Sequence, residues 1–87
     1  MRITYLPHAR RRMEERGISE EEVAVVLEDP ALEYPGRLGR TVAEQILPGG
    51  RLAVKVVYNL GAQDERIIVT VELGRPTRPA EPEGGEQ

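Results

Sequence analysis

The chain has 87 residues, no cysteine and a formal net charge of −3. A chain of this length predicts one small domain with a modest core, because such domains bury only roughly 60–65% of their unfolded surface. The absence of cysteine excludes a disulfide framework and a thiolate metal site, and it favours a cytoplasmic protein over a secreted one. No segment resembles a signal peptide or approaches the ~20 apolar residues of a membrane span, so we expect no membrane partner.

The charges are segregated along the chain. Residues 1–16 hold five arginines and two glutamates, whereas residues 19–33 hold six acidic residues and no basic one. Residues 36–58 are basic again, with four basic residues and one glutamate. The net charge argues against nonspecific nucleic-acid binding, but this segregation permits one basic face.

The first predicted elements are a short strand and a helix. Residues Arg2–Leu6 alternate between polar and apolar side chains, as a brief strand would. Pro7 suits the first turn of a helix, where its missing N–H is not needed. We expect this helix to start at Pro7 or His8 and to end at Arg16, with Gly17 as its left-handed C-terminal cap.

A second helix is predicted from its start signal. Ser19 and Glu22 have the spacing of a capping box, in which each side chain accepts a hydrogen bond from the other residue's backbone N–H. Ile18 and Val23 are placed for the hydrophobic staple that accompanies such a box. Pro30 disfavours helical backbone in the residue before it and should end this helix.

The remainder of the chain predicts strands. The Pro48–Gly50 turn is typical of a hairpin between two such segments. The expected fold is α+β, with two N-terminal helices packed on a three- to four-stranded antiparallel sheet, over residues 1–73. The candidate strands are Ala31–Tyr34, Arg40–Leu47, Arg51–Leu60 and Arg66–Leu73.

Residue alternation assigns two faces to the last two strands. One face is predicted to be apolar and to meet the helices, and the other is semi-polar. The expected apolar face consists of Leu52, Val54, Val56, Tyr58, Ile67, Val69, Val71 and Leu73. The other face includes Lys55, Ile68, Thr70 and Glu72.

Residues 74–87 form a tail rich in proline, glycine and glutamate. It contains no large apolar residue, so it cannot contribute to a core and is expected to be disordered.

The first helix carries the main candidate site. At 100° per residue, its only apolar side chains are Ala9 and Met13, and Arg12 and Arg16 lie at their edge next to His8. In a structural interpretation, the two guanidinium groups pair with the acidic second helix or with strand carbonyls, and the histidine lies at the core edge. In a functional interpretation, the arginines bind a phosphate in a cleft and the histidine transfers a proton. The sequence leaves both interpretations open.

Other candidates are less specific. Arg40, Arg51 and Lys55 could extend a basic substrate-binding face, although charged residues on strands often only solvate or protect an edge. Thr70 could supply a hydroxyl donor, although threonine is also a good strand former. With one histidine and no cysteine, a transition-metal site is not expected, and no cofactor-binding motif is present.

A family resemblance adds to these observations. The chain resembles the family called domain of unknown function 4258 over roughly residues 4–73. The resemblance rests on a generic pair of closing strands, Leu52–Tyr58 and Ile67–Val71, and on a more specific opening. That opening reads His8-Ala9-x-x-Arg12-Met13-x-x-Arg16-Gly17-Ile18-Ser19, followed by Val23, Leu27 and Asp29-Pro30.

That family is similar in layout to the RelE/ParE and BrnT toxins and is often grouped with metal-independent ribonucleases. The resemblance implies a toxin-like ribonuclease that acts on RNA and is held by an antitoxin protein. It implies a site of His8, Arg12 and Arg16, with Thr70 and Arg40 as lesser candidates.

Two other functions remain alternatives. One is a non-catalytic module of the same fold that binds protein or nucleic acid and dimerises through exposed strand edges. The other is a small-molecule-binding housekeeping domain. An enzyme would gather the candidate residues around one open cleft, whereas a module would hold them apart or in ion pairs with the acidic residues 20–33.

Overall fold

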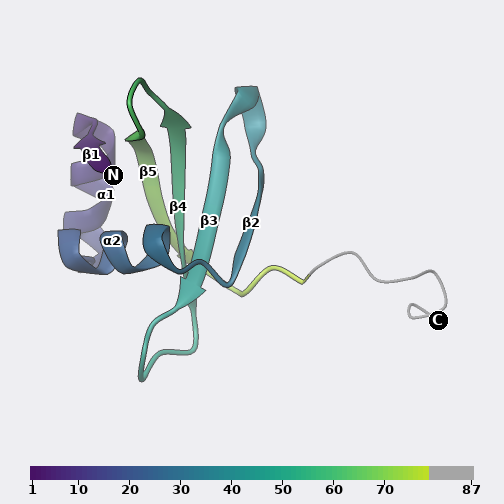
Figure 1. Cartoon of the computed structure of the whole chain (residues 1–87). Helices are drawn as coiled ribbons and strands as arrows, with labels where there is room; N and C mark the ends of the chain where they lie inside the picture. The colour runs from purple at the N-terminus through teal and green to yellow at the C-terminus, as the bar shows by residue number, and fades with distance from the viewer. Residues whose placement is uncertain (79–87) are drawn as a thin grey trace, which may run out of the picture.

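The computed structural model of this chain describes residues 1–78. Two helices follow a short first strand, and four further strands follow the helices (Figure 1). The elements are β1 (Arg2–Tyr5), α1 (Pro7–Arg16), α2 (Glu20–Glu28), β2 (Leu32–Pro35), the 3₁₀ turn η1 (Arg37–Gly39), β3 (Thr41–Ile46), β4 (Ala53–Leu60) and β5 (Glu65–Gly74).

The strands form one five-stranded mixed sheet in the order β1-β5-β4-β3-β2. The predicted α+β class is confirmed, but the predicted three- to four-stranded antiparallel sheet is wrong in two respects. Both short candidate strands join the sheet, and β1 pairs parallel to β5. A parallel pair needs a long crossover connection, and the chain between these two strands supplies one. No local sequence pattern reports such a pairing.

Helix α1 lies beside β5 (Figure 1). The parallel pairing with β1 ends at Tyr5, which lies opposite Ile68. The backbone N–H of Leu6 then donates to the carbonyl of Ile68 at 3.1 Å, and the helix starts at the next residue. The helix therefore covers the second half of β5, and its buried residues Ala9 and Met13 face the core.

The predicted ends of both helices are confirmed. Gly17 caps α1 in the left-handed conformation, at φ 67°. At the start of α2, Ser19 Oγ accepts from the backbone N–H of Glu22 at 3.1 Å, and Glu22 Oε1 accepts from the backbone N–H of Ser19 at 2.9 Å. Helix α2 lies across β3 and β4 (Figure 1) and buries Val23, Val26 and Leu27.

A β-bulge decides which residues of β5 enter the core. Val57 lies opposite Thr70, but the next residue, Tyr58, lies opposite Ile68, so Val69 is the extra residue. An extra residue reverses the alternation on one side of the bulge. The predicted apolar face is therefore wrong for the first half of β5, where Ile68 is fully buried and Ile67 is only partly buried.

The sheet face opposite α2 is crossed by the chain that follows β5. The backbone N–H of Thr77 donates to Glu44 Oε2 at 2.7 Å, and Pro76 and Thr77 line a small hollow with residues of β3 and β4. The predicted boundary at residue 73 thus falls inside β5, which ends at Gly74. The expected disorder of residues 74–87 stays a prediction, and residues 79–87 of this tail lie outside the described residues.

None of the helices within residues 1–78 has the length and apolar character that crossing a bilayer requires.

Candidate functional site

Helix α1 and strand β5 bring four of the predicted site residues together around a carboxylate. Arg16 Nη2 lies 2.9 Å from Glu72 Oε1, and Arg12 Nε lies 3.6 Å from Glu72 Oε2. Thr70, two residues before Glu72 on the same face of β5, donates its hydroxyl to Glu72 Oε2 at 2.9 Å. The α1–β5 packing thus gathers two guanidinium groups and one hydroxyl on one carboxylate.

His8 joins this group through Arg12, one helical turn away. Arg12 Nε donates to His8 Nε2 at 3.4 Å. Because the same Nε lies 3.6 Å from Glu72 Oε2, the imidazole nitrogen and the carboxylate oxygen are at most about 7 Å apart (3.4 Å plus 3.6 Å). We call His8, Arg12, Arg16, Thr70 and Glu72 the α1–β5 cluster.

The cluster is open to solvent and nearly balanced in charge. The side chains of Arg12 and Glu72 are each 36% exposed and that of Arg16 is 28% exposed. Glu15 Oε1 also lies near both arginines, 3.3 Å from Arg12 Nη1 and 3.4 Å from Arg16 Nη1. Partly exposed ion pairs contribute only about 0–1 kcal/mol each, so an incoming anion could displace either carboxylate at small cost.

In the structural interpretation, Arg12 and Arg16 would pair with the acidic second helix or with strand carbonyls, but the structure pairs them with other carboxylates. The two cluster arginines pair with Glu15 of their own helix and with Glu72, and it is Arg10 that pairs with Glu20, at 2.7 Å. Helix α1 presents different arginines to α2 and to β5, because residues two positions apart project in different directions.

Glu72 is the functional candidate that sequence reasoning did not select. One signal was present, because Thr70 and Glu72 are two residues apart in a strand and must share a face. What the sequence could not supply is that α1 lies against this edge of β5.

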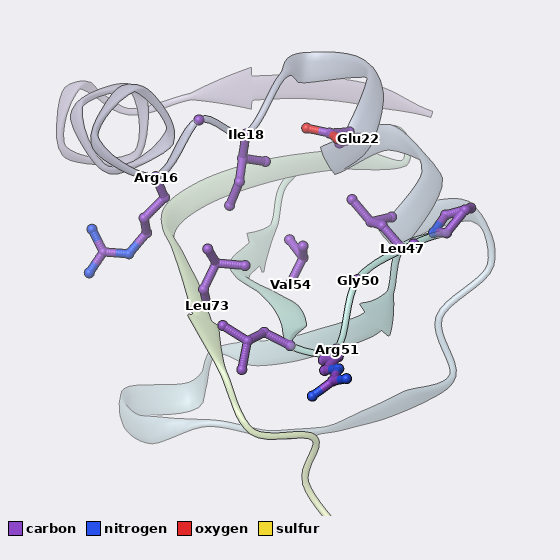
Figure 2. Close-up of a pocket in the computed structure, with 12 residues that line it drawn as sticks. Arg16, Ile18, Glu22, Leu47, Gly50, Arg51, Val54 and Leu73 are labelled. Atoms are coloured by element: carbon purple, nitrogen blue, oxygen red, sulfur yellow. The ribbon is translucent and has the colours of Figure 1, made fainter.

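Arg51 borders a cavity that Arg16 also borders. The cavity has a volume of about 370 Å³ and lies between the start of α2, the β3–β4 connection and the end of β5. Figure 2 shows apolar side chains at its centre and the guanidinium groups of Arg16 and Arg51 at its periphery. Arg16 therefore borders both this cavity and the cluster.

Lys55 is adjacent to the cluster in the sheet but is held by other groups. It lies opposite Glu72 on one side and opposite Glu44 on the other. Its Nζ contacts Thr77 Oγ1 at 3.2 Å and lies 3.9 Å from Glu44 Oε1. Within the described residues, the polar contacts of Lys55 Nζ lie on the Glu44 side, away from the arginines.

Glu44 is the most buried charged residue described, with 3% exposure. Burial by itself raises the pKa of Glu44, but the hydrogen bonds from the Thr77 backbone, the Tyr34 hydroxyl and the Thr77 side chain, together with Lys55, bring that pKa below its usual value. Tyr34 donates to Glu44 Oε1 at 2.9 Å, and burial in turn raises the pKa of Tyr34. These groups fix the chain after β5 to the sheet.

Arg40 lies apart from the other candidates. It precedes β3 and borders a separate hollow at the β2–β3 hairpin, with which the cavity at Arg51 shares no residue. Its carbonyl accepts from the backbone N–H of Gly36 at 2.7 Å, which closes the hairpin. The structure does not bring Arg40 to the α1–β5 cluster.

Within residues 1–78, no group of three or more His, Asp or Glu side chains is arranged to hold a metal ion.

Comparison with known proteins yields one family. No curated protein and no solved structure matches the chain significantly, and nothing links it to the RelE/ParE or BrnT toxins, so that likeness stays a prediction. The model of the family described as a domain of unknown function (DUF4258) matches residues 5–72, which is most of the chain. The protein therefore belongs to the DUF4258 family.

Proposed function

We propose that the protein is a metal-independent ribonuclease and that the α1–β5 cluster is its active site. The observation that carries this proposal is the position of Glu72, which lies within reach of Arg12, Arg16 and the Thr70 hydroxyl, with His8 one contact further away. Cleavage by the RNA 2′-hydroxyl needs a base, an acid and cationic groups for the phosphorane, and these residue types supply all three.

Glu72 is suited to act as the base. Its carboxylate accepts a hydrogen bond from the Thr70 hydroxyl, so it can also accept the proton of a substrate hydroxyl that takes the same position. We assign His8 the role of the acid, because histidine is the side chain that most often transfers protons in catalysis. A single histidine thus does not have to perform both proton transfers.

The proposed reaction is balanced without any other reactant. Glu72 takes the proton of the 2′-hydroxyl while the 2′-oxygen forms a bond to phosphorus. The bond from phosphorus to the 5′-oxygen breaks, and His8 protonates that oxygen. The products are a 2′,3′-cyclic phosphate and a free 5′-hydroxyl. Arg12 and Arg16 stabilise the charge on the equatorial phosphoryl oxygens, because the planar guanidinium group can donate two hydrogen bonds to a pair of phosphate oxygens.

The experiment is cleavage of mixed RNA by the purified protein in the presence of EDTA. We expect His8→Ala and Arg12→Ala to lose cleavage. Arg11→Ala is the matched control, since Arg11 is exposed, lies on the same helix and makes no ion pair within the described residues. Intact RNA with the wild-type protein, or equal cleavage by all variants, would exclude this active site. The cluster would then be a structural ion-pair network in a binding module.

A further inference from the structure

The cavity next to Arg16 combines an apolar wall with two arginines at its rim. Its volume of about 370 Å³ is at the lower end of the range of roughly 300–1,000 Å³ for small-molecule sites. Its wall contains five aliphatic side chains contributed by three separate parts of the chain. These are Ile18, Leu47, Leu52, Val54 and Leu73.

Part of this apolar wall is open to water. Leu52 is 48% exposed and Leu73 is 38% exposed, although both border the cavity. Leu52 lies in the connection between β3 and β4, whereas Leu73 lies in β5, and both border this cavity. Together they form an exposed apolar surface that a flat apolar ligand could cover.

The rim of the cavity is basic. Arg51 follows the Pro48–Gly50 turn and makes no ion pair with any residue in the described part of the chain. Arg16 is held by Glu72 and Glu15 from the opposite side. The one carboxylate that borders the cavity, Glu22, is engaged by the backbone N–H of Ser19. A ligand here would therefore combine an apolar plane with a peripheral anion.

We propose that this cavity binds one nucleotide of an RNA strand, with the base against the aliphatic wall and the adjoining phosphate between Arg16 and Arg51. A guanidinium plane can also stack on a base, which gives Arg51 a second contact. The proposal rests on the proposed function, because Arg16 borders both the cavity and the cluster and would join the bound phosphate to the reacting one.

The test is titration of the ¹⁵N-labelled full chain with guanosine 3′-monophosphate at low salt, monitored by amide chemical shifts. We expect saturable shifts in residues 17–18, 47 and 49–52, with affinity reduced about tenfold or more in Arg51→Ala and in Leu52→Ser. Both side chains are exposed, so both variants should keep the wild-type spectrum elsewhere. Arg11→Ala should bind as the wild-type protein does.

Each other outcome has a defined meaning. Absence of saturable shifts at these residues would overturn the proposal, whether or not the protein cleaves RNA. Equal shifts with inorganic phosphate alone would overturn the base-binding part, and equal affinity for guanosine would overturn the phosphate-binding part. Nucleotide binding without RNA cleavage would support this site while excluding the proposed ribonuclease activity.

Discussion

Arg16 and Glu72 form an ion pair that joins the last turn of α1 to the far end of β5, with 2.9 Å between Nη2 and Oε1. Both side chains are partly exposed, so the pair adds at most about 1 kcal/mol to the stability of the fold. Its main consequence is positional. It keeps a carboxylate next to two arginines and, through Arg12, close to a histidine.

Replacing Glu72 separates its proposed catalytic role from its structural one. Glu72→Gln should lower the rate of RNA cleavage by about 10²–10⁴, the usual contribution of a general base. The free energy of unfolding should change by less than about 1 kcal/mol, as for a partly exposed ion pair. The measurements are initial cleavage rates with EDTA and urea denaturation.

Glu15→Gln is the matched control for Glu72→Gln. Glu15 also contacts both cluster arginines but receives no hydrogen bond from Thr70. We expect it to retain cleavage. A Glu72→Gln protein that cleaves at the wild-type rate would remove Glu72 from the mechanism.

The bulge in β5 predicts opposite sensitivities for two adjacent isoleucines. Ile68→Ala should lower the free energy of unfolding by about 2–5 kcal/mol, because it leaves a cavity in the core. Ile67→Ala should cost clearly less, because Ile67 is only partly buried. Urea denaturation of both variants tests this. A larger loss for Ile67→Ala would contradict the register of β4 and β5.

The contact between Thr77 and Glu44 predicts that the first residues after β5 stabilise the domain. A chain that ends at Gly74 should lose about 1–3 kcal/mol of stability, since a hydrogen bond to a charged group has about that worth. A chain that ends at Arg78 keeps Thr77 and should unfold as the full chain does. Equal stability of the two shortened chains would show that Thr77 contributes nothing.

Glu44 also predicts a loss of stability in acid. Its pKa in the folded protein lies below its ordinary value of 4.5. The unfolded state therefore binds a proton first as the pH falls. The contribution of Glu44 to stability is complete above pH 4.5 and is lost as the pH falls from there through the folded-state pKa.

The measurement is the free energy of unfolding from pH 7 to pH 3. Glu44→Gln should flatten the decline below about pH 4.5, whereas Glu14→Gln, at an exposed position of α1, should leave the decline unchanged. An identical decline in Glu44→Gln would contradict the role of this carboxyl group. In Glu44→Gln, some loss of stability in acid should remain from Asp64, because the hydrogen bond from Arg66 lowers the pKa of Asp64 in the folded protein.

The sequence by itself determined the helices and their ends. Pro7, Gly17, Ser19 and Glu22 act on backbone groups within four residues of themselves, so their effects can be inferred without knowing the rest of the fold. The alternation in β4 is likewise local, and Val54 and Val56 are buried as predicted. The opening motif of α1 also identified the family, which the family match confirms.

Only the tertiary structure decided the remaining features. The parallel pairing of β1 with β5 joins residues more than sixty positions apart, and the bulge at Val69 arises from the pairing with β4. The meeting of Arg12 and Arg16 with Glu72 depends on the first of these, because α1 follows β1 in the chain and lies beside β5 after β1 has ended. A pattern of neighbouring residues reports local backbone preferences, whereas these contacts depend on how distant segments pack.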